Sequence, residues 1–442
     1  MVLITKILSK SFFKVISVVS GSNFFSKIEL IKKYEFKSRE KIDDFQYSQL
    51  KKIISEAYEN VPFYKERYEK AGIKPEALKN VSDLSKFPIV TKKEIRGEYK
   101  RMINKKFKIK NLKYTQSSGS TGEPKIFYFD KEAYGWRLAS QFYGWQRAGF
   151  EFGDKWLRIS MAERNTLFYK LFNFFSRCIY ISLTDFNEKK YEKIRLILEK
   201  EKPTVIYSYC SALYVLSEYL DSKKYSFDFV KTIIVQGDMC FPKYREKIEK
   251  VFKTKVFDTY GGDGVVISGQ CEHGSYHIQD TGVIIEIVDD DYNIVRKGVP
   301  GRILVTDLHN SAMPLIRYEI ADLGKKLDIK CPCGSKFSIM SNPIGRDTDI
   351  IKLSNGMSLL VEYFVVLFEY YLDVLQFQVR EVGQDTLEIY LKVTDQFSRE
   401  IEKKIKQELI NYCKGGVKVD IKIVQEIALE KSNKRRLVIG RN

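Results

Sequence analysis

Short apolar segments and amphipathic helical segments alternate through the middle of the chain, and this alternation constrains the fold more than any other feature. Apolar runs of strand length occur at KWLRIS, TVIYSY, KTIIVQG and KVFDTYG. Between them, apolar residues recur at helical spacing in EKKYEKIRLILEKE and PKYREKIEKVF. Buried strands that alternate with helices are typical of a layered α/β sheet. Ligands of such sheets usually bind in the loops at the carboxyl ends of the strands.

The last hundred residues follow a different pattern. The segment LQFQVREVGQDTLEIYLKV alternates apolar and polar residues on both sides of a polar turn, which predicts two paired strands. SREIEKKIKQELINYCKGG is an amphipathic helix that ends at two glycines, and VKVDIKIV returns to strand alternation. We therefore predict an α/β fold with a large layered N-terminal domain, residues 1–344, and a small, mobile α+β C-terminal domain, residues 345–442.

The net charge of +18 is dispersed along the 442 residues and is not gathered in one tail. Such a surface suits acidic substrates and anionic membranes. No motif that reads RNA or DNA is present, so we predict no nucleic-acid partner. Four of the seven cysteines stand singly in apolar or helical surroundings, as in a reduced, cytoplasmic protein. These cysteines are Cys178, Cys210, Cys240 and Cys413.

The first 36 residues mix apolar residues with lysines at short intervals. The lysines are too frequent for a transmembrane helix, and the segment lacks the usual cleavage site of a secretory signal. Two interpretations remain for this amphipathic extension of about 40 residues. It contacts a membrane surface peripherally, or it is a helix packed on the domain, and we favour the second.

The stretch SSGSTGEPK is rich in the groups that bind phosphate. Hydroxyl groups and the backbone N–H groups of a glycine-rich turn donate hydrogen bonds to phosphate oxygens. The stretch is not a Walker A motif, because its lysine follows Pro124 and leads into IFYF, which alternates like a strand. A flexible hairpin turn is the alternative explanation of its composition.

Three later stretches in the same order carry a resemblance to a known family. SSGSTGEPK resembles the phosphate loop of the adenylate-forming (ANL) ligases, and DTYGGDG resembles their adenine motif. MPLIRYEIADLG resembles their ribose-binding segment, and GRDTD resembles their interdomain hinge. Within this superfamily, AYENVPFYKERYEKAGI and the final EKSNKRRLVI are similar to the phenylacetate-CoA ligase branch, most closely to its relatives in capsular polysaccharide biosynthesis.

The resemblance implies a role for each matching residue. The phosphates of ATP would lie against Ser117, Ser118, Gly119, Ser120, Thr121, Gly122 and Lys125. The adenine would be bordered by Gly237, Asp238, Tyr260 and Gly261, and the ribose would be held by Asp322 with Arg346. Lys434 would reach the acid's carboxylate and the α-phosphate, and its alternative role is an exposed lysine of a basic tail. Rotation near Thr348 and Asp349 would exchange Lys434 for the second substrate.

One departure from the family pattern concerns Mg²⁺. The superfamily usually has a glutamate four residues after the tyrosine, and here that position is Gly264. Asp263 is the candidate replacement, because a carboxylate is the hard ligand that Mg²⁺ needs. The adenylation step depends on whether this replacement works.

Three cysteines and one histidine suggest a structural zinc site. QCEHGSYH supplies Cys271 and His277, and CPCG supplies Cys331 and Cys333. Three thiolates and one imidazole match a closed tetrahedral site, and the phenylacetate-CoA ligase branch carries a similar set. His273 is the competing imidazole, and three unligated thiols are the alternative to any metal site.

The sequence therefore predicts an ATP-dependent, AMP-forming ligase that activates a carboxylic acid as an acyl-adenylate. Two predictions remain for the group that accepts the acyl chain. Similarity to the capsule relatives favours an amine or hydroxyl in surface polysaccharide biosynthesis, and the phenylacetate branch favours the thiol of coenzyme A. An inactive nucleotide-binding scaffold is the alternative from another class, supported by Gly264 and opposed by the retained motif residues. The acid itself cannot be read, because aromatic residues such as Trp136, Phe142 and Tyr143 are typical of a core.

Overall fold

The chain forms two compact units in a computed structural model. The structure describes residues 2–117, 125–160, 166–182, 188–237, 239–346, 351–355, 358–359, 363–364, 367–368, 370–371, 373–427 and 436–440. The first unit takes in residues 1–117, 125–320 and 325–341, and the second takes in 118–124, 321–324 and 342–442. The domain boundary at residue 345 stays a prediction of the sequence.

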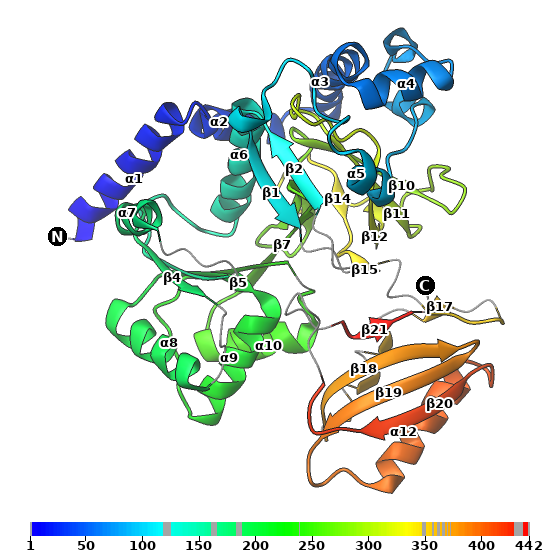
Figure 1. Cartoon of the computed structure of the whole chain (residues 1–442). Helices are drawn as coiled ribbons and strands as arrows, with labels where there is room; N and C mark the ends of the chain where they lie inside the picture. Colours follow the sequence, from blue (N-terminus) through cyan, green and yellow to red (C-terminus); the bar gives the residue numbers. More distant parts are fainter. Residues whose placement is uncertain are drawn as a thin grey trace. The chain divides into compact units, whose positions relative to one another are not determined.

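A nine-stranded sheet with the order β13-β14-β9-β8-β7-β6-β5-β3-β4 forms the framework of the first unit (Figure 1). Its parallel part consists of β3 (Trp156–Ser160), β4 (Cys178–Ser182), β5 (Val205–Tyr209), β6 (Thr232–Gln236) and β7 (Val256–Gly262). Its antiparallel part consists of β8 (Val265–Gln270), β9 (Tyr276–Ile278), β14 (Ile339–Met340) and β13 (Lys326–Leu327). The four strands predicted from KWLRIS, TVIYSY, KTIIVQG and KVFDTYG are β3, β5, β6 and β7.

Helices cover both faces of the parallel strands, as an α/β sandwich requires. Against one face pack α8 (Glu188–Glu201), α9 (Cys210–Ser222) and α10 (Pro242–Phe252). The other face packs against α2 (Phe24–Glu35) and α6 (Lys131–Arg147), and the buried residues of this layer include Trp136, Phe142 and Tyr143. The prediction that these aromatic residues belong to the core is confirmed. The four cysteines that stand singly in the sequence are buried as well.

A second sheet carries the strands that lead to the ribose motif. It contains β10 (Val283–Val288), β11 (Gly301–Asp307) and β12 (Tyr318–Gly324), and its apolar residues pack with α3 (Arg39–Asn60) and α4 (Pro62–Lys70). The side chains of Thr91 and Glu94 form a capping box at the start of α5 (Lys92–Glu98). Three 3₁₀ turns complete this region: η1 (Pro75–Ala77), η2 (Val81–Lys86) and η3 (Ile109–Asn111).

The remaining elements of the first unit frame the phosphate loop and form its N-terminal extension. A hairpin of β1 (Lys113–Ser117) and β2 (Lys125–Phe129) flanks the loop. The extension is α1 (Val2–Val19), which contacts α7 (Leu167–Phe175). The packed-helix interpretation holds for one face of α1, where Phe13 is buried, while the opposite face is exposed.

The second unit contains the predicted α+β motif. Its sheet has the order β20-β19-β18-β21, from β18 (Val374–Gly383), β19 (Thr386–Val393), β20 (Lys418–Ile423) and β21 (Val438–Ile439). The helix α12 (Arg399–Tyr412) begins after the capping side chain of Ser398 and buries Ile405 and Leu409. Short pairs are formed by β16 (Ile351–Lys352) with β17 (Ser358–Leu359), and by the end of β12 with β15 (Ile344–Arg346).

Candidate nucleotide site and metal centre

The β7–β8 turn positions the predicted adenine motif. β7 pairs with β8 through a register shift between Tyr260 and Gly261, and Tyr260 is a partly buried ring against the core of the first unit. A Cβ atom at Gly261 would lie 2.4 Å from the carbonyl oxygen of Val265, so only glycine fits the pairing there. The bulge therefore fixes the direction of the tyrosine that would stack on adenine.

Asp263 is held at the tip of this turn in the left-handed region, at φ 51°. The hydroxyl of Tyr318 donates a 2.5 Å hydrogen bond to its Oδ2 atom. Tyr318 is fully buried, so its ring has little freedom to move and its hydroxyl holds the carboxylate in one orientation. Sequence reasoning missed Tyr318, since it lies 55 residues away and no spacing rule connects the two positions.

Gly264, where the superfamily usually has glutamate, has no room for a side chain. Its φ is 85°, and a Cβ atom would lie 2.4 Å from Cζ of Phe129 and 3.2 Å from Cγ2 of Thr115. Both the backbone conformation and the buried ring of Phe129 exclude a larger residue. The packing of this turn therefore requires glycine at position 264, where the superfamily usually has glutamate.

Gly237 follows β6 at the carboxyl edge of the sheet and also has a positive φ, of 85°. A Cβ atom there would lie 2.5 Å from the ring of Tyr209, which ends the neighbouring strand β5. The next residue of the predicted adenine border, Asp238, lies outside the described residues. Only glycine fits at position 237, and an aromatic ring lies beside it, as the predicted adenine border requires.

The predicted ribose residues lie opposite each other within the second unit. Asp322 of β12 is the direct antiparallel partner of Arg346 of β15. The backbone pairing places both positions at one point of the sheet.

The other predicted phosphate and catalytic residues are described only in part. Ser117 and Lys125 end the two strands of the β1–β2 hairpin and are paired in register. Residues 118–124 and Lys434 lie outside the described part of the chain, and so do Thr348 and Asp349 of the predicted hinge. The roles of these residues stay predictions.

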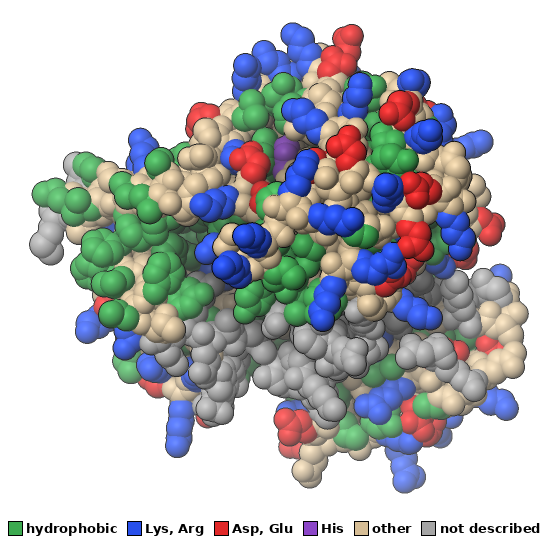
Figure 2. Space-filling model, turned by 45° about the horizontal axis from the view of Figure 1, so that its top comes forward, with side chains coloured by type: hydrophobic (Ala, Val, Ile, Leu, Met, Phe, Trp, Pro, Cys, Tyr) green, Lys and Arg blue, Asp and Glu red, His purple; other side chains and the backbone are tan. Residues whose placement is uncertain are grey.

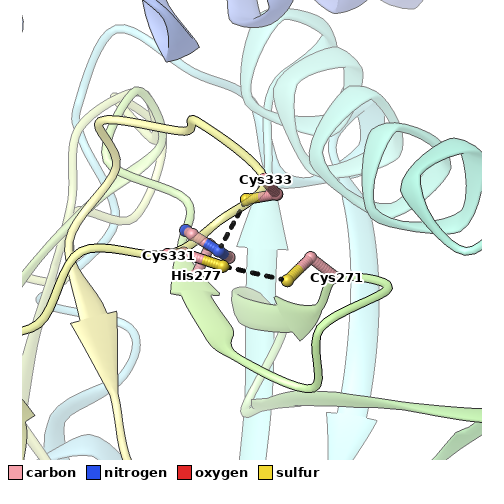
Figure 3. Close-up of side chains that lie close together, drawn as sticks. All are labelled: Cys271, His277, Cys331 and Cys333. Atoms are coloured by element: carbon pink, nitrogen blue, oxygen red, sulfur yellow. Dashed lines mark hydrogen bonds between the residues drawn. The ribbon is translucent and has the colours of Figure 1, made fainter.

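The four predicted metal ligands converge on one point of the first unit (Figure 3). The Sγ atoms of Cys271 and Cys331 are 3.5 Å apart, and Sγ of Cys333 is 3.4 Å from Nε2 of His277. All four ligand atoms lie within 4.8 Å of one another. His273 is not part of the cluster and is near Glu272 at the surface.

The donor set fits zinc. Ligand atoms around a tetrahedral zinc ion with bonds of about 2.3 Å are about 3.7 Å apart, close to the distances here, whereas a disulfide requires about 2.05 Å. Burial lowers the pKa of His277 to about 4, so the imidazole is in its neutral, ligating form. Burial also raises the pKa of Cys333 to about 12, so this thiol needs a bound cation to lose its proton.

Arg147 is a second residue that sequence reasoning missed. Its Nη2 atom donates to Sγ of Cys333 at 3.4 Å, and its Nη1 atom pairs with Glu35 at 2.8 Å. Three thiolates around Zn²⁺ leave one net negative charge, which a guanidinium compensates. Arg147 is 186 residues from Cys333 in sequence, so only the packing of α6 against this loop brings them together.

Comparison with known proteins supports the superfamily inferred from the motifs. No family model matches the chain. It is 24% identical over 391 residues to the phenylacetate-coenzyme A ligase of Thermus thermophilus, covering 83% of this chain and 85% of that protein. The corresponding Escherichia coli ligase is 25% identical over 377 residues, covering 82% and 84%.

Solved structures show the same fold. A 2-hydroxyisobutyryl-CoA ligase in complex with 2-HIB-AMP matches with a TM-score of 0.76 and 18% identity, over 93% of this chain and 92% of that one. An anthranilate CoA ligase in complex with anthranoyl-AMP matches with a TM-score of 0.55 and 14% identity, over 74% and 64%. The chain thus has the mixed α/β fold, with a large and a small domain, of adenylate-forming ligases.

Proposed function

We propose that this chain is an AMP-forming acid ligase that joins a carboxylic acid to the thiol of coenzyme A. The observation that carries the proposal is the match to phenylacetate-coenzyme A ligases over more than four fifths of both chains, with the adenine and ribose motifs in order along it. The acceptor amine or hydroxyl predicted from the capsule resemblance has no support among these relatives, so the thiol is the better proposal.

The proposed reaction has two steps. The carboxylate oxygen of the acid attacks the α-phosphorus of ATP and pyrophosphate leaves, which forms the acyl-adenylate. The thiolate of coenzyme A then attacks the acyl carbonyl carbon, and AMP leaves. Lys125 and Lys434 would balance the negative charge of the first step, and Asp322 would accept hydrogen bonds from the two ribose hydroxyls.

Asp263 is the proposed ligand of Mg²⁺. The Tyr318 hydroxyl engages Oδ2 and orients the carboxylate, whose two oxygens offer several acceptor positions for a hard cation. Bound Mg²⁺ would neutralise charge on the phosphates. The cysteine and histidine cluster is the proposed site of a structural Zn²⁺ that ties the loop after β8 to the loop before β14.

Pyrophosphate release over a panel of carboxylic acids, with and without coenzyme A, tests the proposal. We expect release with at least one acid, and AMP together with an acyl thioester once coenzyme A is added. Amine and hydroxyl acceptors in place of coenzyme A test the polysaccharide alternative, which product formation with them alone would favour. Tight ATP binding without pyrophosphate release from any acid would support the inactive scaffold.

A further inference from the structure

Two arginines of the first unit have no acidic partner. Arg137 lies on α6 and Arg158 on β3, and within the described ranges neither guanidinium forms an ion pair or hydrogen bond. The Nε atom of each is buried without a partner. Two other arginines of this unit differ, since the buried Arg317 pairs with Glu286 at 3.0 Å and the half-buried Arg147 pairs with Glu35. Both residues are half-buried, and a partly desolvated guanidinium without a counter-charge is unfavourable, so this pair needs an explanation.

The two guanidinium groups repel each other, and each lies over an aromatic ring. Cζ of Arg158 is 5.3 Å from the ring centre of Tyr207, and Cζ of Arg137 is 5.8 Å from that of Phe129. Gln141 donates to the Tyr207 hydroxyl at 3.1 Å. Burial lowers the pKa of Arg137, nearby Tyr134 and Tyr207 oppose this shift, and repulsion from Arg158 adds to it. Ring contacts offset only part of the cost of burying two like charges.

Each arginine is linked through aromatic rings to one of the two adenine motifs of the first unit. Phe129, on which Arg137 stacks, is the ring that a side chain at Gly264 would meet. Tyr207, on which Arg158 stacks, is followed two residues later on the same strand face by Tyr209, the ring beside Gly237. One aromatic ring therefore separates Arg137 from a nucleotide motif, and two separate Arg158 from the other.

We propose that the acid substrate carries a second anionic group, such as a carboxylate, phosphate or sulfate, which the guanidinium groups of Arg137 and Arg158 bind. This rests on the proposed function, because an acyl group joined to AMP must extend from the adenine motifs into the adjoining interior. Guanidinium groups match such oxyanions with paired hydrogen bonds. The proposal selects one class of acid from the many that the fold accepts.

Matched pairs of acids test it, each pair differing only by a second anionic group, for example phenylacetate with carboxyphenylacetate and hexanoate with adipate. We expect the dianionic member to be preferred in kcat/KM by about 10- to 100-fold in pyrophosphate release. Arg158→Gln should remove this preference through the KM of the acid and leave the KM of ATP unchanged. Arg195→Gln is the control, since Arg195 is an arginine of α8 already paired with Glu192 and Glu199.

Two further measurements distinguish failure of the proposed ligase function from failure of the proposed arginine site. If no acid releases pyrophosphate, the proposed function fails, and calorimetric binding of adipate to wild type and Arg158→Gln still decides the arginine site. A structural role predicts a clearly lower melting temperature for Arg158→Gln, whereas a ligand site predicts little loss, because only the ring contact with Tyr207 is removed and no ion pair or hydrogen bond. Preference for monoanionic acids, no binding of adipate, or a raised KM for ATP in Arg158→Gln would overturn the proposal.

A separate observation concerns an exposed apolar surface on α1 and α7. The two helices lie side by side, since Phe12 stacks on Phe175 with ring centres 5.2 Å apart. The exposed apolar side chains of this α1–α7 surface, green at the left of Figure 2, include Ile4, Leu8, Val18, Leu167, Phe168 and Phe174. An apolar surface of this extent marks an interaction site. Among the described helices, none is long and apolar enough to cross a membrane.

The charged residues around the α1–α7 surface indicate which kind of partner it binds. The described helices α1 and α7 carry four lysines and no carboxylate. Lys10 and Lys14 also line a groove of about 430 Å³ that includes the rings of Phe25 and Phe152, together with Lys32, which pairs with Glu29. A second copy is a poor partner, because a two-fold contact would place the same lysines against each other. An apolar face beside lysines matches an interfacial helix on an anionic bilayer.

We infer that the α1–α7 surface binds an anionic lipid bilayer peripherally. Sedimentation with vesicles tests this, and we expect binding to phosphatidylcholine mixed with phosphatidylglycerol to exceed binding to phosphatidylcholine alone by about tenfold. Phe174→Asp should abolish binding, and Lys10→Gln with Lys14→Gln should weaken it. Tyr370→Asp, at an exposed aromatic residue of the second unit, is the control. Unchanged binding in Phe174→Asp, or a changed oligomeric state without lipid binding, would overturn the inference.

Discussion

Replacing Gly264 by alanine should destabilise the first unit through the turn that carries Asp263. The new Cβ atom would lie 2.4 Å from Cζ of Phe129 and 3.3 Å from its Cε2 atom. Carbon atoms in contact are about 3.5–4.0 Å apart, so the overlap exceeds an ångström. Phe129 cannot move aside easily, because its ring is only 2% exposed in the core.

Two effects contribute to the expected loss. The left-handed φ of 85° costs an alanine about 1–2 kcal/mol, and overpacking the core costs about 1–3 kcal/mol. Together they lower the free energy of unfolding by about 2–5 kcal/mol. For a unit of this size the melting temperature falls by about 1.5 °C per kcal/mol, so we expect a decrease of about 3–8 °C in a thermal scan.

Gly262→Ala is the matched control within the same turn. Its Cβ atom would approach Ile320 no closer than 3.5 Å, and its φ is not positive, so the melting temperature should stay within about 1 °C of wild type. Adding Phe129→Leu to Gly264→Ala should recover part of the steric loss. A Gly264→Ala protein as stable as the control would refute the reasoning, and with it the explanation of why this turn has no glutamate.

Three further predictions concern the metal, the nucleotide and acid stability. Purified protein should contain about one zinc ion per chain and Cys333→Ser much less by atomic emission; a metal-free wild type would contradict the zinc site. Asp322→Asn should raise the KM of ATP about tenfold or more in pyrophosphate release, because a charge-assisted pair of hydrogen bonds is lost, and an unchanged KM would contradict the ribose role. Burial lowers the pKa of His309 to about 3, so the unfolded chain takes up a proton below about pH 6.5 that the folded chain does not. The free energy of unfolding should therefore fall by up to about 5 kcal/mol as the pH decreases from 6.5 to 3, and His309→Gln should show a smaller decrease in urea midpoints across that range.

The sequence alone determined much of the backbone. The helices α8 and α10 have the bounds of the two predicted amphipathic segments, and Thr91 caps α5. Such elements are predictable because helical spacing and capping involve residues only a few positions apart. The antiparallel strands β8 to β12 were not predicted, since their pairing joins residues that no local period connects.

The candidate site also has one part that the sequence predicts and one part that only the structure shows. The sequence indicated the candidate residues for phosphate, ribose and metal binding, because the motifs keep these residue types at short spacings. The structure confirms the predicted choice of His277 over His273 beside the three cysteines, and only the tertiary structure shows that Tyr318 orients Asp263. The placement of two unpaired arginines beside the adenine motifs was decided there as well. These contacts depend on which strands and helices are neighbours, and neighbours are set by the burial of whole faces and not by any one segment.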